Sequence, residues 1–170
     1  MRKTLLVVDM EEGAALGRYH GNYLNRRWWE RHAQVVENIR SLSEVFDEVV
    51  FVTDTRFRKK SHMRIVTPLR SLAQKSRQYL KRQDDGATVL ADKLDPANEV
   101  MIVGMNTDAC ILRTARGLLQ HGFNVLVVGD ACWTAYAAKS TQPHHRALNR
   151  IRNMGIGVSN TQKLCASMRA

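Results

Sequence analysis

The chain has 170 residues and a formal net charge of +10, from 26 Lys and Arg against 16 Asp and Glu. This length suits one domain with a substantial core, and we expect a single domain over residues 1–170. The apolar runs are only strand-sized and no signal-peptide pattern opens the chain, which disfavours a membrane span and favours a cytoplasmic protein. Three cysteines without a CxxC pair disfavour a disulfide framework and a zinc site.

The first half of the chain is predicted to contain three strands and one long helix. In chain order, the pattern predicts a strand over 4–9, a loop over 11–25, a helix over 28–45, a strand over 47–53, a short helix over 65–73, a strand over 77–81 and a short helix over 88–94. The long helix has a wide apolar face, so Trp28 and Trp29 are interpreted as core or interface residues rather than as a ligand cage.

A basic segment, residues 56–82, contains ten Lys or Arg residues and no acidic residue. Such a segment attracts anions, whether a phosphorylated or carboxylated substrate, nucleic acid or an acidic partner. A solvated basic loop with no binding role explains the pattern equally well.

The second half of the chain alternates strands and helices. The pattern predicts strands over 100–103, 125–128 and 156–159, helices over 109–121 and 143–153, and a loop over 130–142. Together with the first half, this order favours an α/β fold with a doubly wound, mostly parallel sheet flanked by helices, a Rossmann-like three-layer arrangement.

Cys110 lies where an apolar strand becomes a helix, which Thr107 or Asp108 could cap. Open α/β sheets place ligand sites at this edge, and the first turn of a helix stabilises a thiolate or an oxyanion. The alternative is a small core residue, since free cysteine is among the most buried residue types.

Asp9 ends the first strand at the same predicted edge as Cys110, so the two side chains can meet if their strands are neighbours. A carboxylate can then accept the thiol proton, but a cation is needed nearby because a thiolate beside a carboxylate is unfavourable. Lys81, at the end of a predicted strand, is the preferred cation. Its rivals are Lys75, Arg82 and Lys93.

These segments resemble the isochorismatase-like cysteine hydrolases. LLVVDM at 5–10 is similar to the opening strand of that family with its catalytic aspartate. GMNTDACILRTARGLLQHGFNVLVVGDAC at 104–132 is similar to its cysteine block, and HHRALNRIRNMGIGVSNT at 144–161 to its closing helix and strand. The resemblance therefore extends over most of the chain.

The resemblance implies a catalytic triad of Asp9, Lys81 and Cys110. It further implies an oxyanion hole built from the backbone N–H groups of Cys110 and Asn106, and a cis peptide bond between Met105 and Asn106. The implied reaction is hydrolysis of a C–N bond in a small molecule, or less commonly of an enol ether such as isochorismate. The family also implies a homo-oligomer, a dimer or a tetramer.

The chain departs from its nicotinamidase relatives in the residues that would bind metal. In that subgroup an Asp-x-His pattern and a further histidine hold a divalent ion, whereas this chain has Asp54-Thr55-Arg56 and then only His62. We therefore expect no metal or other cofactor and disfavour nicotinamidase activity. A second departure is Glu11, where many relatives have glutamine or asparagine, and we expect it to add a negative charge near the Cys110 thiolate.

Two functional hypotheses remain at this point. The preferred one is a cysteine-dependent amide, ureide or carbamate hydrolase acting on a small, anionic molecule, with Trp133, Arg82 and Met105 as candidate substrate-binding residues. The alternative is a catalytically altered scaffold that binds nucleic acid or an acidic partner through residues 56–82. The absence of RNP-like aromatic motifs and of a recognisable helix-turn-helix disfavours nucleic acid as the partner.

Overall fold

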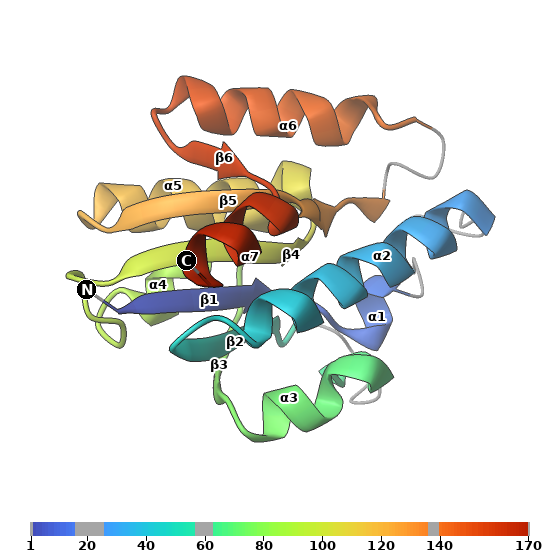
Figure 1. Cartoon of the computed structure of the whole chain (residues 1–170), viewed down its shortest axis with the longest axis horizontal. Helices are drawn as coiled ribbons and strands as arrows, with labels where there is room; N and C mark the ends of the chain where they lie inside the picture. The colour runs from blue at the N-terminus through green and yellow to red at the C-terminus, as the bar shows by residue number, and fades with distance from the viewer. Residues whose placement is uncertain (1, 16–25, 57–62, 136–139, 170) are drawn as a thin grey trace.

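The computed structural model describes residues 2–15, 26–56, 63–135 and 140–169. Six strands form one sheet in the order β3-β2-β1-β4-β5-β6, and every neighbouring pair is parallel (Figure 1). The strands are β1 (Lys3–Val8), β2 (Glu48–Asp54), β3 (Arg77–Lys81), β4 (Glu99–Met105), β5 (Asn124–Trp133) and β6 (Gly157–Ser159). The predicted α/β class and doubly wound sheet are confirmed.

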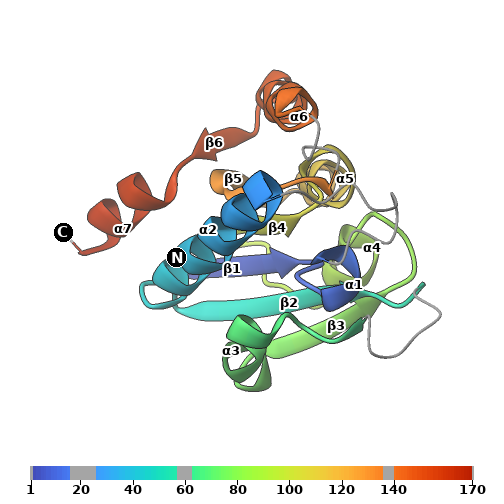
Figure 2. The ribbon, with the colours of Figure 1, turned by 90° about the vertical axis from the view of Figure 1, so that its right-hand side faces the viewer.

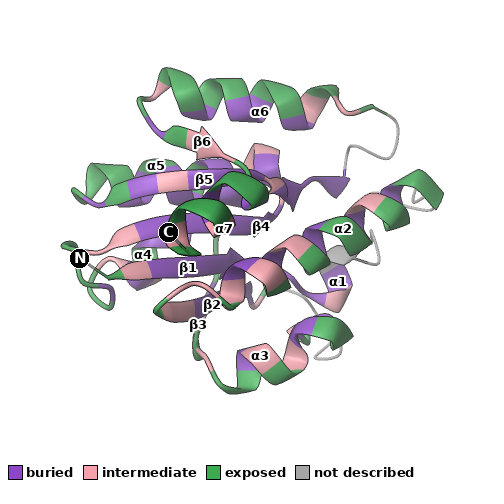
Figure 3. Ribbon diagram, in the orientation of Figure 1, coloured by how far each residue is buried: buried purple, intermediate pink, exposed green. Residues whose placement is uncertain are grey.

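Helices cover both faces of the sheet, so the molecule has three layers (Figure 2). One face carries α2 (Arg26–Ser43), α3 (Arg70–Gln74) and α7 (Thr161–Arg169), and the other carries α4 (Ala87–Leu90), α5 (Leu112–Gln120) and α6 (Gln142–Asn153). Alternate residues of β1 enter the two cores, Leu5 and Val7 on the α2 side and Leu6 and Val8 on the α5 side. The central strands β1, β2, β4 and β5 are therefore mostly buried, the edge strands β3 and β6 are largely exposed or half-buried, and the outer surfaces of the helices are exposed (Figure 3).

The direction of strand addition reverses between β1 and β4. From β1 the chain adds β2 and β3 on one side, and then returns to add β4, β5 and β6 on the other. In open α/β sheets a crevice forms at the carboxyl ends of the strands where this reversal occurs. Asp9 directly follows β1, and Cys110 lies in the turn after β4, so both residues lie at the strand ends where this reversal occurs.

Gly104 allows β1 and β4 to approach each other closely. Its φ is +114°, and a Cβ placed there would lie 2.1 Å from the backbone oxygen of Val8. Val8 pairs with Gly104 in the register of the two strands. Both the positive φ and the short distance to Val8 therefore require glycine at position 104. Its partner Val8 is the residue just before Asp9.

Replacing Gly104 by alanine is expected to lower the free energy of unfolding by at least about 3 kcal/mol, because strand β1 must shift away and a left-handed conformation must bear a side chain. Gly122→Ala is the matched control, since Gly122 also has positive φ (+82°) but has open space around it. That variant should lose only about 1–2 kcal/mol. Urea denaturation measures both changes, and equal losses in the two variants would contradict the close-approach argument.

Several predicted boundaries are corrected by the structure. Strand β5 continues to Trp133, through the start of the predicted loop. The helix after β4 begins with a single π-helical turn, Thr107–Ile111, before α5. Helix α7 was not predicted, and part of the predicted loop over 11–25 is helical, α1 (Glu12–Ala15). The rest of that loop lies outside the described residues. Across the described ranges, no helix is long and apolar enough to span a membrane.

Neither proposed capping residue caps the helix after β4. The N-cap position is Asn106 and shows no side-chain cap. Instead, the Thr107 hydroxyl forms a hydrogen bond of 2.9 Å with His144 Nδ1, and Asp108 accepts a hydrogen bond from the hydroxyl of Thr134. These side chains fix the turn to α6 and to the end of β5.

Candidate active site

Asp9, Lys81 and Cys110 come together from three separate elements. The backbone N–H of Asp9 donates to the oxygen of Val52 (2.9 Å), which holds the residue just beyond β1 with a φ of 49°. Lys81 is the last residue of β3 and pairs in register with Asp54. Cys110 lies in the π-helical turn after β4. The side chains of all three are buried.

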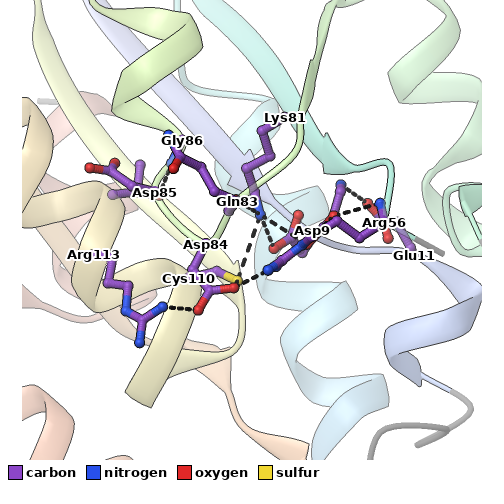
Figure 4. A network of polar contacts seen from close by, with 12 residues as sticks. Asp9, Glu11, Arg56, Lys81, Gln83, Asp84, Asp85, Gly86, Cys110 and Arg113 are labelled. Carbon is purple, nitrogen blue, oxygen red and sulfur yellow. Dashed lines mark hydrogen bonds and ion pairs between the residues drawn. The ribbon is translucent and has the colours of Figure 1, made fainter.

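The Lys81 ammonium group is the centre of this cluster (Figure 4). It lies 2.8 Å from Asp9 Oδ2, 3.7 Å from Cys110 Sγ and 3.6 Å from Asp54 Oδ2. A further hydrogen bond of 3.0 Å reaches the backbone oxygen of Gln83. Lys81 is 0% exposed. The structure thus brings together the three residues that the resemblance implies.

The rival cations are not part of the cluster. Lys75, Arg82 and Lys93 are all exposed. The pairing of β3 with β2 explains the difference, because it directs Lys81 to the same strand end as Asp54.

The ionisation of the three residues favours a neutral thiol beside a carboxylate. Burial raises the pKa of Asp9 to about 6, against the opposing charge of Lys81. Burial and the charge of Asp9 also raise the pKa of the Cys110 thiol well above its usual range. Burial works against the charged form of Lys81, but the carboxylate of Asp9 outweighs it and raises the pKa of the ammonium group. At pH 7 the site therefore holds a lysine cation, an ionised Asp9 and a thiol that needs a base to react.

A second layer of ion pairs surrounds the cluster. Arg56 Nε donates to both oxygens of Asp54, at 2.8 and 3.0 Å, and the same guanidinium group pairs with Asp84. Asp84 also pairs with Arg113 and accepts a weak hydrogen bond from the Cys110 thiol at 3.9 Å. Burial opposes ionisation of Asp54, but hydrogen bonds from Arg56 hold its pKa below the usual range. Sequence analysis did not identify Asp84 or Arg113, because their pairing depends on the turn after β3.

Glu11 is a buried carboxyl group beside the site. Its Oε1 accepts a hydrogen bond of 2.5 Å from the backbone N–H of Asp54, and the residue is 0% exposed. Burial, reinforced by the charge of Asp9, raises its pKa to about 9. Glu11 is therefore protonated and neutral at pH 7, and it adds no negative charge next to Cys110.

The residues near Asp54 do not fit a metal ion. The Asp54 carboxylate is occupied by the guanidinium group of Arg56. His62 lies outside the described residues. Within the described ranges, no group of three His, Cys, Asp or Glu side chains could hold a metal.

The other predicted site residues have different environments. The Met105 side chain is 1% exposed and packs in the core on the α2 side, and its role as a substrate contact stays a prediction. Arg82 is exposed just after β3. The predicted cis peptide bond between Met105 and Asn106 is confirmed, and Asn106 Oδ1 accepts a hydrogen bond from the backbone N–H of Ala135. Trp133 is buried against Arg31 and His144, away from the Lys81 cluster.

Much of the basic segment is paired within the protein. Of the seven basic residues in this segment that the structure describes, four form ion pairs with acidic side chains: Arg56 with Asp54 and Asp84, Arg70 with Glu12, Arg77 with Glu48 and Lys81 with Asp9. Because these charges are offset internally, the segment presents a smaller free positive charge than its composition indicates. Residues 57–62 lie outside the described ranges.

This three-layer α/β fold carries its buried polar cluster at the carboxyl ends of parallel strands, where open α/β sheets bind their ligands. The chain belongs to the isochorismatase family, since the model of the isochorismatase domain matches residues 3–163. Members of this family include hydrolases, some of them cysteine hydrolases. The predicted family is thus confirmed.

Individual relatives agree with this assignment. Isochorismatase domain-containing protein 2 of Rattus norvegicus is 36% identical over 73 residues, which are 43% of this chain and 33% of that protein. The match thus spans about a third of the length of that curated relative. Among solved structures, a nicotinamidase from Bacillus subtilis superposes with a TM-score of 0.75 at 20% identity, covering 94% of this chain and 100% of that one. A cysteine hydrolase from Pseudomonas syringae gives 0.75 at 14% identity, covering 99% and 92%. These two likenesses concern the fold.

Proposed function

We propose that the chain is a cysteine-dependent hydrolase that cleaves a C–N bond of the amide, ureide or carbamate type in a small molecule. The observation that carries this proposal is the buried contact of the Lys81 ammonium with both Asp9 (2.8 Å) and Cys110 (3.7 Å). A nucleophile, a base and a fixed cation at one point are the groups that acyl transfer to sulfur requires.

The first chemical step is attack of Cys110 Sγ on the substrate carbonyl carbon. As the S–C bond forms, the thiol proton passes to Asp9, whose pKa of about 6 leaves it ionised at neutral pH. The carbonyl oxygen becomes an oxyanion, for which the backbone N–H groups of Asn106 and Cys110 are the proposed donors. Lys81 stabilises the negative charge that moves between the sulfur and Asp9.

The second step breaks the C–N bond, and Asp9 returns the proton to the leaving nitrogen. A water molecule then attacks the thioester carbon and gives one proton to Asp9. Collapse of this second intermediate breaks the S–C bond, and the sulfur recovers its proton from Asp9. The product is a carboxylic acid from an amide, a carbamic acid from a ureide or a carbonic acid monoester from a carbamate, and the last two lose carbon dioxide. The enzyme thus ends the cycle in its starting protonation state.

Turnover of a substrate panel tests the proposal. The purified protein is incubated with small amides, ureides and carbamates, each in an anionic and a neutral form, and with isochorismate. Release of ammonia or amine is measured, with mass spectrometry for the acid product. The proposal expects C–N cleavage of at least one compound. Hydrolysis of isochorismate alone would contradict C–N cleavage and point to an enol ether substrate. Hydrolysis that persists without the Cys110 thiol would contradict Cys110 as the nucleophile.

The decrease of kcat/KM at low pH, the acid limb of its pH profile, should report the ionisation of Asp9. Because Asp9 must be ionised to accept the thiol proton, kcat/KM should fall about tenfold per pH unit as the pH decreases below about 6. Glu11→Gln is the matched variant, since Glu11 is already neutral at this pH and glutamine keeps an oxygen for the Asp54 N–H. The limb should remain near pH 6 in that variant. A flat profile between pH 5 and 8, or a limb that moves by a full unit in Glu11→Gln, would contradict the assignment of the base.

A further inference from the structure

A separate cavity of about 400 Å³ lies between the first turns of α2 and α6, next to the end of β5. In Figure 1 this region is on the right-hand side, where β5 ends and where α2 and α6 begin. The residues that matter in its lining are Arg27, Arg31, Trp133, His144 and His145. None of the residues of the Lys81 cluster lines it.

Two buried N–H donors at this cavity have no acceptor. Trp133 is only 5% exposed, and its indole Nε1 makes no hydrogen bond within the described part of the chain. The same holds for Nε of Arg31. Both groups can donate but not accept, and each buried donor left without a partner costs about 1–3 kcal/mol. An acceptor placed in the cavity would remove this cost.

The geometry around Trp133 restricts how a ligand can contact it. The Arg31 guanidinium carbon lies 5.2 Å from the centre of the indole ring, and the His144 ring centre lies 5.0 Å away with the planes tilted by 50°. These neighbours crowd the ring, so stacking of an aromatic ligand on Trp133 is disfavoured. Contact through the indole N–H is the interaction that remains.

The charge of the lining favours an anion. Arg27 and Arg31 contribute two cations, while the one carboxylate of the lining, Glu30, is bonded to Arg26 at 2.7 Å. His144 is uncharged at neutral pH, since burial and the neighbouring charges lower its pKa to about 4. The cavity therefore combines positive charge with unsatisfied donors, which is the chemistry of an oxyanion site.

The cavity is connected to the turn that carries Cys110. His144 Nδ1 forms a hydrogen bond of 2.9 Å with the hydroxyl of Thr107, the first residue of the π-helical turn. An occupant that contacts His144 therefore acts on the same turn as the nucleophile. This contact gives the cavity a direct structural relation to the candidate active site.

We propose that this cavity is an oxyanion subsite, distinct from the Asp9–Lys81–Cys110 cluster, that binds the carboxylate or phosphate group of a small molecule through the Trp133 indole N–H and the Arg31 guanidinium group. The subsite does not depend on the proposed hydrolytic activity. It accounts for the buried donors of both residues and gives Trp133 an anion-binding role.

Nuclear magnetic resonance of the ¹⁵N-labelled protein tests this subsite. The indole N–H signal of Trp133 is identified by its loss in Trp133→Phe, and it is followed during titration with inorganic phosphate and, separately, with acetate at constant ionic strength. We expect a saturable downfield shift of that signal with at least one of the two anions. The signal of the exposed Trp29, which lies outside this cavity, should stay in place. Comparison of the two anions shows whether the subsite prefers phosphate or carboxylate.

Arg31→Gln is the variant that tests the second donor. It should weaken binding of the preferred anion about tenfold while the protein remains folded, because a charged donor is replaced by a neutral one. A Trp133 signal that moves no more than that of Trp29, or a non-saturating shift that sodium chloride reproduces, would overturn the proposal.

The titration is repeated with Cys110→Ala. If the Trp133 signal still shifts in an inactive protein, the subsite stands without the hydrolase proposal. If the wild-type protein is active but its Trp133 signal does not shift, the hydrolase proposal stands without the subsite.

Discussion

Replacing Cys110 by alanine is expected to reduce kcat/KM for the best panel substrate by at least about three orders of magnitude. The variant removes the atom that forms the thioester, while Lys81 and Asp9 keep their ion pair at 2.8 Å. The fold should persist, because alanine is only one sulfur atom smaller and Lys81 retains its other partners. The measurement is steady-state kinetics, with a thermal melt of the same sample.

Cys132→Ala is the matched control for this variant. Cys132 is also a fully buried thiol, but it lies in β5 and its Sγ donates to the backbone oxygen of Ile102 at 3.8 Å. Burial raises its pKa, as it does for Cys110, but no lysine of the described residues acts on it as Lys81 acts on Cys110. Its loss should leave kcat within about threefold. If the two alanine variants were equally active, Cys110 would not be the nucleophile.

Replacing Lys81 by methionine is expected to have the second largest effect, on both activity and stability. Methionine preserves most of the volume but removes the only ammonium group in contact with Asp9 within the described residues. A buried carboxylate without its cation costs about 3–5 kcal/mol, and the free energy of unfolding should fall by this amount at pH 7. Activity should fall by about two to four orders of magnitude, since the thiolate loses its counter-ion. Urea denaturation and steady-state kinetics measure the two effects.

The double variant Lys81→Met with Asp9→Asn separates structure from catalysis. Neutralising Asp9 removes the uncompensated charge, so the double variant should recover a large part of the lost stability but none of the activity. Lys93→Met, at an exposed position, is the control and should change stability by less than about 0.5 kcal/mol. If the Lys81→Met protein were as stable and as active as the wild type, Lys81 would have no role in the candidate active site.

The positions of Asp9 and Cys110 could be predicted because each follows a strongly apolar run that reads as a buried strand. Parallel strands bring such ends to one edge, and neighbouring strands bring them into contact. Lys81 could be preferred as the cation, but its rivals Lys75, Arg82 and Lys93 could not be excluded, because the choice depends on the register of β3 against β2. A short edge strand whose residues are mostly exposed carries no sequence signal for its register.

The parts that could not be predicted depend on contacts between distant residues. The Gly129-Asp130 pair resembles a turn, but β5 continues because Asp130 accepts hydrogen bonds from the N–H and the hydroxyl of Thr161. This contact fixes the start of α7, which has only a weak apolar pattern of its own. Glu11 was interpreted as an added negative charge, and only its burial shows that it carries a proton.

The arrangement of charges around Cys110 also bears on the chemical durability of the protein. Three cations, Lys81, Arg56 and Arg113, face three carboxylates, Asp9, Asp54 and Asp84, so loss of the Cys110 proton to solvent would leave one unbalanced negative charge in a buried place. Transfer of that proton to Asp9 keeps the charges balanced, but it is unfavourable at rest because the pKa of the Cys110 thiol lies well above that of Asp9. Oxidants and alkylating agents attack thiolates far faster than thiols. The resting cysteine is thus shielded from damage until a substrate arrives to take up the negative charge. The charge balance that keeps Cys110 protonated therefore also slows its oxidation and alkylation in the folded protein.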